Sequence, residues 1–173
     1  MELWDNNFRV DPPGGTKMPK QQRKLLTATF LDRLSRLRSD SKILITVSRL
    51  GRVGEYAERI PLADPEMHSV YCGSNAYVGE IDRIDVRVIV YQVNTDLIVC
   101  YVDAEDLAHE WARKHRIELL PGGGVLRVIE MADDLGVVGE SEERFIELGP
   151  EDRYPSLLAE RVRRSIDNGG LGG

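Results

Sequence analysis

Two neighbouring apolar runs, residues 84–93 and 97–102, constrain the fold of this chain more than any other feature of its sequence. Both runs are rich in Val, Ile and Tyr, and the short polar segment Asn94-Thr95-Asp96 separates them. Such runs on either side of a polar turn are typical of a β-hairpin. The second run has no polar residue, so both faces of its strand are expected to be buried. We therefore predict a central hairpin around which the rest of the sheet is built.

A helix is predicted directly after this hairpin, over residues 104–115. Asp103 is expected to cap its N-terminus, because a short polar side chain before the first helical turn can accept a hydrogen bond from a free backbone N–H. Val102 and Leu107 have the spacing of a hydrophobic staple, and Leu107 and Trp111 lie one turn apart on one side of the predicted helix.

The whole pattern predicts an α+β fold in which helices cover a mainly antiparallel sheet of about six to eight short strands, because the connections are too short for parallel crossovers. The other two helices are predicted over residues 20–38 and 155–167, where apolar residues recur at helical spacing. The remaining strands are expected at residues 42–50 and 56–62, which would form a second hairpin, and at 68–77, 116–120, 125–131, 136–139 and 144–148. Residues 1–19 are expected to form an N-terminal arm, 20–168 a single domain, and 169–173 a flexible Gly-rich tail.

The charges are unevenly divided along the 173 residues, although the net charge is only −6. Residues 1–52 hold 11 of the 23 Lys and Arg and 5 of the 29 Asp and Glu, a net +6; residues 53–173 hold 12 and 24, a net −12. This split has three interpretations: a polyanion site on the basic segment, docking of one copy's basic part on the next copy's acidic part, or neutralisation within one folded chain.

A binding site for a nucleic acid or an anionic surface would use the basic side chains of the first predicted helix and of the residues around position 50. These are Lys20, Lys24, Arg33, Arg36, Arg49 and Arg52. A solvated face on a helix that packs against the core is the alternative. Tyrosines in the predicted strands could stack bases, but the signature of RNA-recognition motifs is missing.

Motifs that would indicate a catalytic or metal site are not found. The sequence has no phosphate-binding loop, no Gly-rich dinucleotide motif, no nucleophile elbow and no zinc-type spacing of Cys and His. We therefore expect no cofactor and no metal. If a catalytic site assembles only in the fold, the candidates are His68, Cys72, His109 and Glu110.

Cys72 and Cys100 both lie in apolar runs, which is typical of buried free thiols in a reducing, cytoplasmic compartment. No apolar run reaches the ~20 residues needed to span a bilayer, so no transmembrane segment is expected. The N-terminus has no basic and apolar stretch of the kind found in secretory signals.

The charge split and the apolar, Pro-rich arm predict a non-catalytic assembly or scaffold protein that forms homo-oligomers and contacts a polyanion through its basic part. Viral structural and matrix proteins offer an analogy for such a role. An RNA- or DNA-binding module is the first alternative, and an enzyme whose site forms only in the fold is the second.

Overall fold

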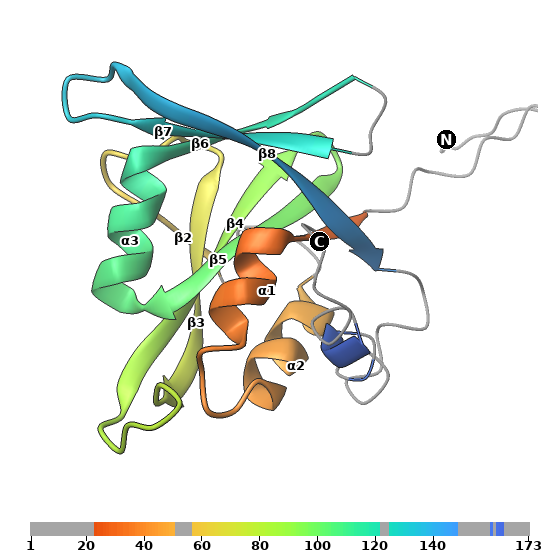
Figure 1. Ribbon diagram of the computed structural model, residues 1–173, viewed down its shortest axis with the longest axis vertical. Coiled ribbons are helices and arrows are strands. Elements are labelled where there is room, and N and C mark those ends of the chain that lie inside the picture. The colour runs from red at the N-terminus through yellow and green to blue at the C-terminus, as the bar shows by residue number, and fades with distance from the viewer. Residues whose placement is uncertain (1–22, 51–56, 122–124, 149–159, 161, 165–173) are drawn as a thin grey trace, which may run out of the picture.

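A curled eight-stranded sheet with helices against it dominates the structure, a computed structural model that describes residues 23–50, 57–121, 125–148, 160 and 162–164 (Figure 1). The strands are β1 (Lys24–Thr27), β2 (Ala57–Arg59), β3 (Met67–Asn75), β4 (Ile84–Val93), β5 (Asp96–Ala104), β6 (His115–Leu119), β7 (Val125–Met131) and β8 (Val137–Leu148). The helices are α1 (Ala28–Leu34), α2 (Ser41–Arg49) and α3 (Glu105–Lys114). The strand order is β2-β3-β4-β5-β1-β8-β7-β6, with β1 parallel to β5 and every other neighbouring pair antiparallel.

The predicted hairpin is confirmed as β4 and β5, and the α+β class with a mainly antiparallel sheet is confirmed in outline. β4 and β5 occupy the third and fourth positions of the sheet, and β5 buries apolar residues on both of its faces. The strands are longer than the expected short ones, since β4 has 10 residues and β8 has 12. The eight strands agree with the predicted six to eight, but the expectation that they would be short was wrong.

The first predicted helix was wrong over its opening turns. Residues 24–27 form β1, and the helix begins only at Ala28. Leu25 and Leu26 are both fully buried, one in each of the two apolar clusters on opposite faces of the sheet. Successive side chains of a strand point to opposite faces, so β1, lying between β5 and β8, buries one leucine on each side of the sheet. Thr27 then caps α1, because its Oγ1 accepts from the Phe30 N–H at 3.0 Å.

The predicted strand at residues 42–50 is a helix, α2, so the predicted second hairpin was also wrong. This segment carries two apolar patterns: alternation at Ile43, Ile45 and Val47, and helical spacing at Ile43, Leu44 and Val47. The structure buries the second set. The turn expected at 51–54 lies outside the described residues, and the returning strand is reduced to β2, which pairs with β3.

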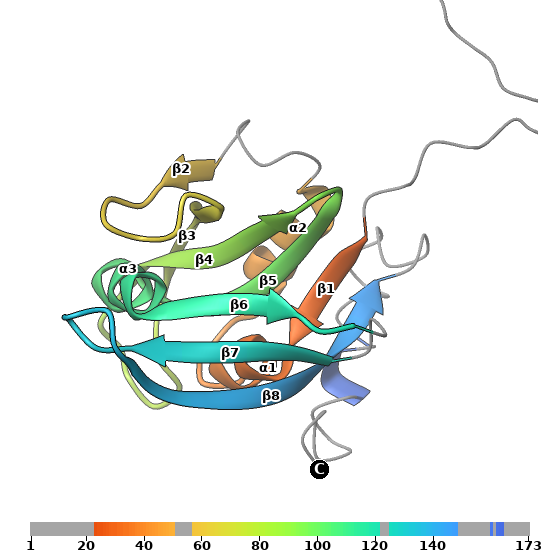
Figure 2. The same ribbon diagram turned by 90° about the horizontal axis from the view of Figure 1, so that it is seen from above.

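The last two predicted strands form one continuous strand, β8. Its first part pairs with β7, and its last four residues pair with β1. β8 therefore links the β6–β7 part of the sheet to the central strands, and the sheet curls where it crosses between them (Figure 2). The change of partner near Arg144 explains why the sequence reads as two separate strands.

Two apolar clusters lie on the two faces of the sheet. The first is covered by α1 and α2 and includes Val162, which supports part of the predicted C-terminal helix, because residues 160 and 162–164 are helical. The second lies between β4–β5, β6–β7 and α3, where Ala108 and Ala112 are buried.

The predicted arm at residues 1–19, the tail at 169–173 and most of the helix predicted at 155–167 lie outside the described residues. Within the described part of the chain, no helix is long and apolar enough to cross a membrane.

Candidate functional site

The basic residues predicted to bind a polyanion differ in how they are used. Lys24 donates to the Val47 and Ser48 carbonyls at the end of α2, at 3.2 and 3.0 Å, and burial lowers the pKa of its ammonium group. Arg33 forms an ion pair with buried Asp103. Both groups therefore serve contacts within the fold. Lys20 and Arg52 lie outside the described residues.

Arg36 and Arg49 are exposed. Arg36 pairs with Asp32 one helical turn away at 3.1 Å, and both side chains remain more than half exposed. Arg38 and Lys42, which the sequence had not singled out, are also exposed beside them. Together these four side chains form what we call the basic face. Across the described residues, no carboxylate lies within ion-pair distance of Arg38, Lys42 or Arg49.

The local charge is strongly positive, because residues 23–50 hold seven Lys and Arg against two Asp. The backbone fixes part of this face: Arg38 N–H donates to the Ala76 carbonyl at 2.8 Å, and Val78 N–H donates to the Arg36 carbonyl at 2.9 Å. The connection between α1 and α2 is thereby tied to the loop between β3 and β4.

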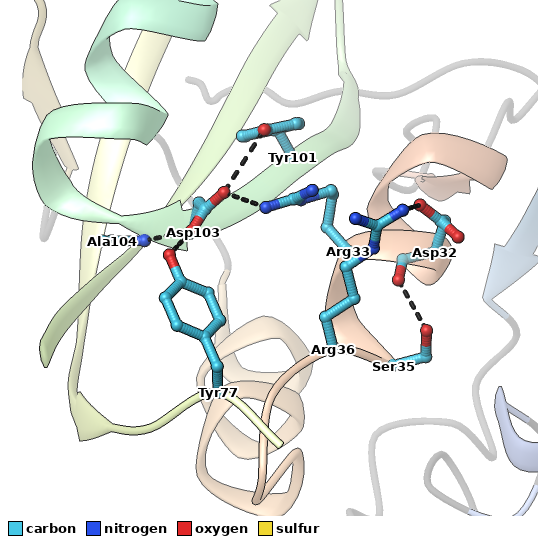
Figure 3. A network of polar contacts seen from close by, with 8 residues as sticks. All are labelled: Asp32, Arg33, Ser35, Arg36, Tyr77, Tyr101, Asp103 and Ala104. Carbon is cyan, nitrogen blue, oxygen red and sulfur yellow. Dashed lines mark hydrogen bonds and ion pairs between the residues drawn. The ribbon is translucent and has the colours of Figure 1, made fainter. Parts of the chain in front are cut away.

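A buried carboxylate joins this loop to α1 and to the sheet. Asp103 is 1% exposed and accepts hydrogen bonds from the Tyr77 hydroxyl, the Tyr101 hydroxyl, the Arg33 guanidinium and the Ala104 N–H (Figure 3). Burial and the neighbouring carboxylate raise the pKa of Tyr77 to about 12, so its hydroxyl stays protonated and donates.

The predicted N-cap role of Asp103 was wrong, since Ala104 occupies that position without a side-chain cap. The predicted staple was also wrong, because Leu107 is exposed.

The opposite charge is concentrated on β7, β8 and the turn between them, residues 125–148, which we call the acidic ribbon. It holds seven Asp and Glu against two Arg. Glu130, Asp133, Asp134, Glu140 and Glu142 are all exposed. In Figure 1 the turn of this ribbon lies at the upper left, whereas α2 lies at the bottom of the molecule. The turn of the ribbon and α2 therefore lie apart, whereas the end of β8 pairs with β1, and Glu147 there forms an ion pair with Arg23 at 3.2 Å.

The turn of the ribbon also displays apolar side chains. Leu135, Val137 and Val138 are 60% exposed or more. Leu135 has a φ of 68°, in the left-handed region that a leucine rarely occupies. Strained backbone and exposed apolar side chains both cost stability, and both are often retained where a surface serves binding.

The four residues proposed as catalytic candidates do not form a reactive centre. Cys72 is buried, and burial raises the pKa of its thiol to about 12, which leaves almost no thiolate at neutral pH. His109 Nε2 lies 2.9 Å from the Ser69 hydroxyl, but Ser69 is 1% exposed and cannot meet a substrate. His68 contacts the Glu66 carbonyl at 3.2 Å, and Glu110 pairs with Lys114 at 3.1 Å on the surface of α3.

The sequence analysis did not find the exposed apolar side chains at the ribbon turn or the hydrogen-bond network around Asp103. The first had a signal, because Leu135, Val137 and Val138 interrupt an acidic segment. The second had none, since the partners of Asp103 are far away along the chain. Comparisons with protein-family models, with curated proteins and with solved structures find no significant match to this chain.

Proposed function

We propose that this chain is a non-catalytic assembly protein, in which the basic face of one copy docks on the acidic ribbon of the next. The observation that carries the proposal is the separation between the exposed cations around α2 and the acidic turn that joins β7 and β8, which lie apart in the molecule (Figure 1). A surface that meets a different surface of its partner forms a head-to-tail interface, which produces rings or filaments.

Three properties of the two surfaces support docking over mutual neutralisation. The exposed cations Arg38, Lys42 and Arg49 have no carboxylate partner among the described residues. Opposite charges across an interface speed association and exclude wrong partners. The apolar side chains of the ribbon turn supply contact area that charges alone do not provide.

A polyanion is the alternative occupant of the basic face, because the same exposed guanidinium and ammonium groups would contact phosphates. Such binding would weaken steeply with salt through the release of counterions. A labelled RNA or DNA oligonucleotide that binds at ~50 mM salt, and loses binding in the variant described next, would assign the face to nucleic acid.

The buried free thiols of Cys72 and Cys100 support an intracellular, reducing location within the same proposal.

The sharpest test reverses the charges on each surface separately. Arg38→Glu with Lys42→Glu alters the basic face, and the new carboxylate in the first turn of α2 is compatible with the helix dipole. Asp133→Lys with Glu142→Lys alters the acidic ribbon at two exposed positions. Each double variant alone should remain monomeric by light scattering, and an equimolar mixture of the two should recover the assembly of the unmodified chain.

Glu58→Lys with Glu66→Lys is the matched control, because both residues are exposed at the β2 edge of the sheet, outside both surfaces. It changes the net charge as much as the ribbon variant does and should assemble normally. If the control loses assembly as fully as the ribbon variant, net charge alone is responsible. If mixing the two charge-reversed variants restores nothing, the head-to-tail docking is wrong.

A further inference from the structure

A cavity of about 270 Å³ lies where α3, β6, β7 and β8 meet the start of α1. Its lining combines aromatic and acidic groups: Thr29, Trp111, His115, Val128, Glu130, Gly139, Glu140, Ser141 and Glu143. The carboxylates come from β7 and β8, so the cavity belongs to the acidic ribbon. No lysine or arginine lines it among the residues that the structure describes.

One wall of the cavity belongs to a row of stacked groups. Arg33 lies 5.4 Å from the centre of the Tyr101 ring, Tyr101 stacks on Trp111 at 4.7 Å, and Trp111 stacks on His115 at 4.3 Å. Both ring pairs are nearly parallel, with interplanar angles of 9° and 11°. The row is held by hydrogen bonds at both ends: Arg33 to Asp103, and His115 Nδ1 to the Trp111 carbonyl at 2.7 Å.

The two ends of the row differ in one respect. At the first end a guanidinium group, an aromatic ring and a buried carboxylate meet in one place, which is a favourable arrangement for a planar cation. At the second end the ring of His115 lines a cavity with Glu130, Glu140 and Glu143, and the cation is missing from the lining. Burial lowers the pKa of His115, so at neutral pH this ring is uncharged and does not repel a cation.

The contacts that these carboxylates make within the chain leave some of their hydrogen-bond acceptor positions unused. Glu143 accepts from the Thr29 N–H and hydroxyl at 2.9 and 2.5 Å, and Glu140 pairs with Arg127 at 3.3 Å. In the described residues no ion pair involves Glu130. The Glu140 side chain lies with Arg127 on the outer face of the ribbon, whereas the side chains of Glu130 and Glu143 lie on the cavity face. A carboxylate accepts about four hydrogen bonds in all, so a bound guanidinium would find acceptors at these two.

We infer that this cavity binds a guanidinium group, stacked beside His115 and held by Glu130 and Glu143. The assignment of its source rests on the proposed function: the guanidinium is an arginine side chain of a neighbouring copy. A free guanidinium compound is the other source with the same chemistry, and the experiment separates the two.

The binding test uses the fluorescence of Trp111 in a full-length Trp4→Phe background, which removes the other tryptophan of the chain. N-acetyl-arginine amide is titrated as the probe, and N-acetyl-citrulline amide, its uncharged counterpart of the same shape, is the ligand control. The arginine probe should change the fluorescence in a saturable way, and the citrulline probe should not. Glu130→Gln with Glu143→Gln should weaken binding about tenfold, as expected for the loss of a charged pair. Glu118→Gln with Glu142→Gln removes the same charge outside the cavity and should leave binding unchanged.

The test is run on the Arg38→Glu, Lys42→Glu chain as well, so that binding is measured without assembly. Saturable binding there supports the cavity even if the unmodified chain never self-associates. In the unmodified chain, a probe that dissociates the assembly identifies the occupant as a neighbour's arginine, and a probe that binds without dissociating it identifies a free compound. Equal response to the arginine and citrulline probes, or no response in the Arg38→Glu, Lys42→Glu chain, overturns the inference and leaves the assembly proposal standing.

Discussion

The carboxylate of Asp103 shows how much of this fold depends on one side chain. Its donors come from α1, β5 and the loop before β4, so it ties three segments together. A buried charge is tolerated only when it is paired and fully hydrogen-bonded, and Asp103 meets that condition. The sequence suggested only a local cap, because Tyr77 and Arg33 lie 26 and 70 residues away and no local pattern reveals them.

Asp103→Ala is expected to lower the free energy of unfolding by about 3–5 kcal/mol, because it leaves Arg33 and two tyrosine hydroxyls without their acceptor. Asp32→Ala, which removes an exposed ion pair on α1, should cost no more than about 1 kcal/mol. Urea denaturation of both variants measures the difference. Equal losses would show that the Asp103 network stabilises the fold no more than an exposed ion pair does.

Leu135 and Leu62 form a natural pair for testing the ribbon turn. Both are exposed and both have a φ of 68°. Replacing either with Gly should stabilise the chain by about 1 kcal/mol, because glycine adopts this conformation without strain. Only Leu135→Gly should also weaken self-association, measured by light scattering. If Leu62→Gly loses assembly instead, the contact between copies is not at the ribbon turn.

His115 predicts a pH dependence of stability. Burial lowers its pKa in the folded chain below the ordinary 6.5, so as the pH falls below 6.5 the unfolded chain takes up the proton first. Stability should therefore decrease as the pH falls from 6.5 toward the lower folded pKa and stay level above about 7. His109 also has a lowered pKa and acts in the same direction. His115→Gln should flatten this slope in urea denaturation between pH 5.5 and 7.5, and an unchanged slope would contradict the assignment.

The elements of the fold differ in how well the sequence predicts them. The β4–β5 hairpin was predictable because two long apolar runs on either side of a short polar turn fit a pair of buried strands and no other element. α2 was not, since Ile43, Leu44, Ile45 and Val47 satisfy both a strand and a helix pattern. β1 was missed because its place between β5 and β8 is decided by strands that follow it by 70 residues or more.

Lys24 links two of these mispredicted elements, and its replacement tests that link. Lys24→Met keeps the length of the side chain but removes the two hydrogen bonds to the last carbonyls of α2. We expect about 1 kcal/mol of destabilisation and faster amide hydrogen exchange at the end of α2. Lys42→Met, an exposed change in the first turn of the same helix, is the control. Unchanged exchange in Lys24→Met would mean that the contact contributes nothing to the helix.

At the scale of the whole molecule, the sequence revealed that charge was divided but not where it would lie. The net values of the two segments were available from composition. The curl of the sheet places the turn between β7 and β8 far from α2 (Figure 1), although β8 itself passes beside α1, where Glu143 accepts from Thr29. The cavity beside His115 was likewise not predictable, because its lining comes from five elements, α1, α3, β6, β7 and β8, that meet only in the fold.

Light scattering of the full chain over a range of protein and salt concentrations tests the central claim most directly. At ~50 mM salt, where charges act over more than 10 Å, head-to-tail docking predicts a mass that grows with concentration to several times the 19.5 kDa of one chain. At ~1 M salt, where that range falls to about 3 Å, it predicts a return toward the single-chain mass. A monomer that persists at low salt and high protein concentration would contradict it.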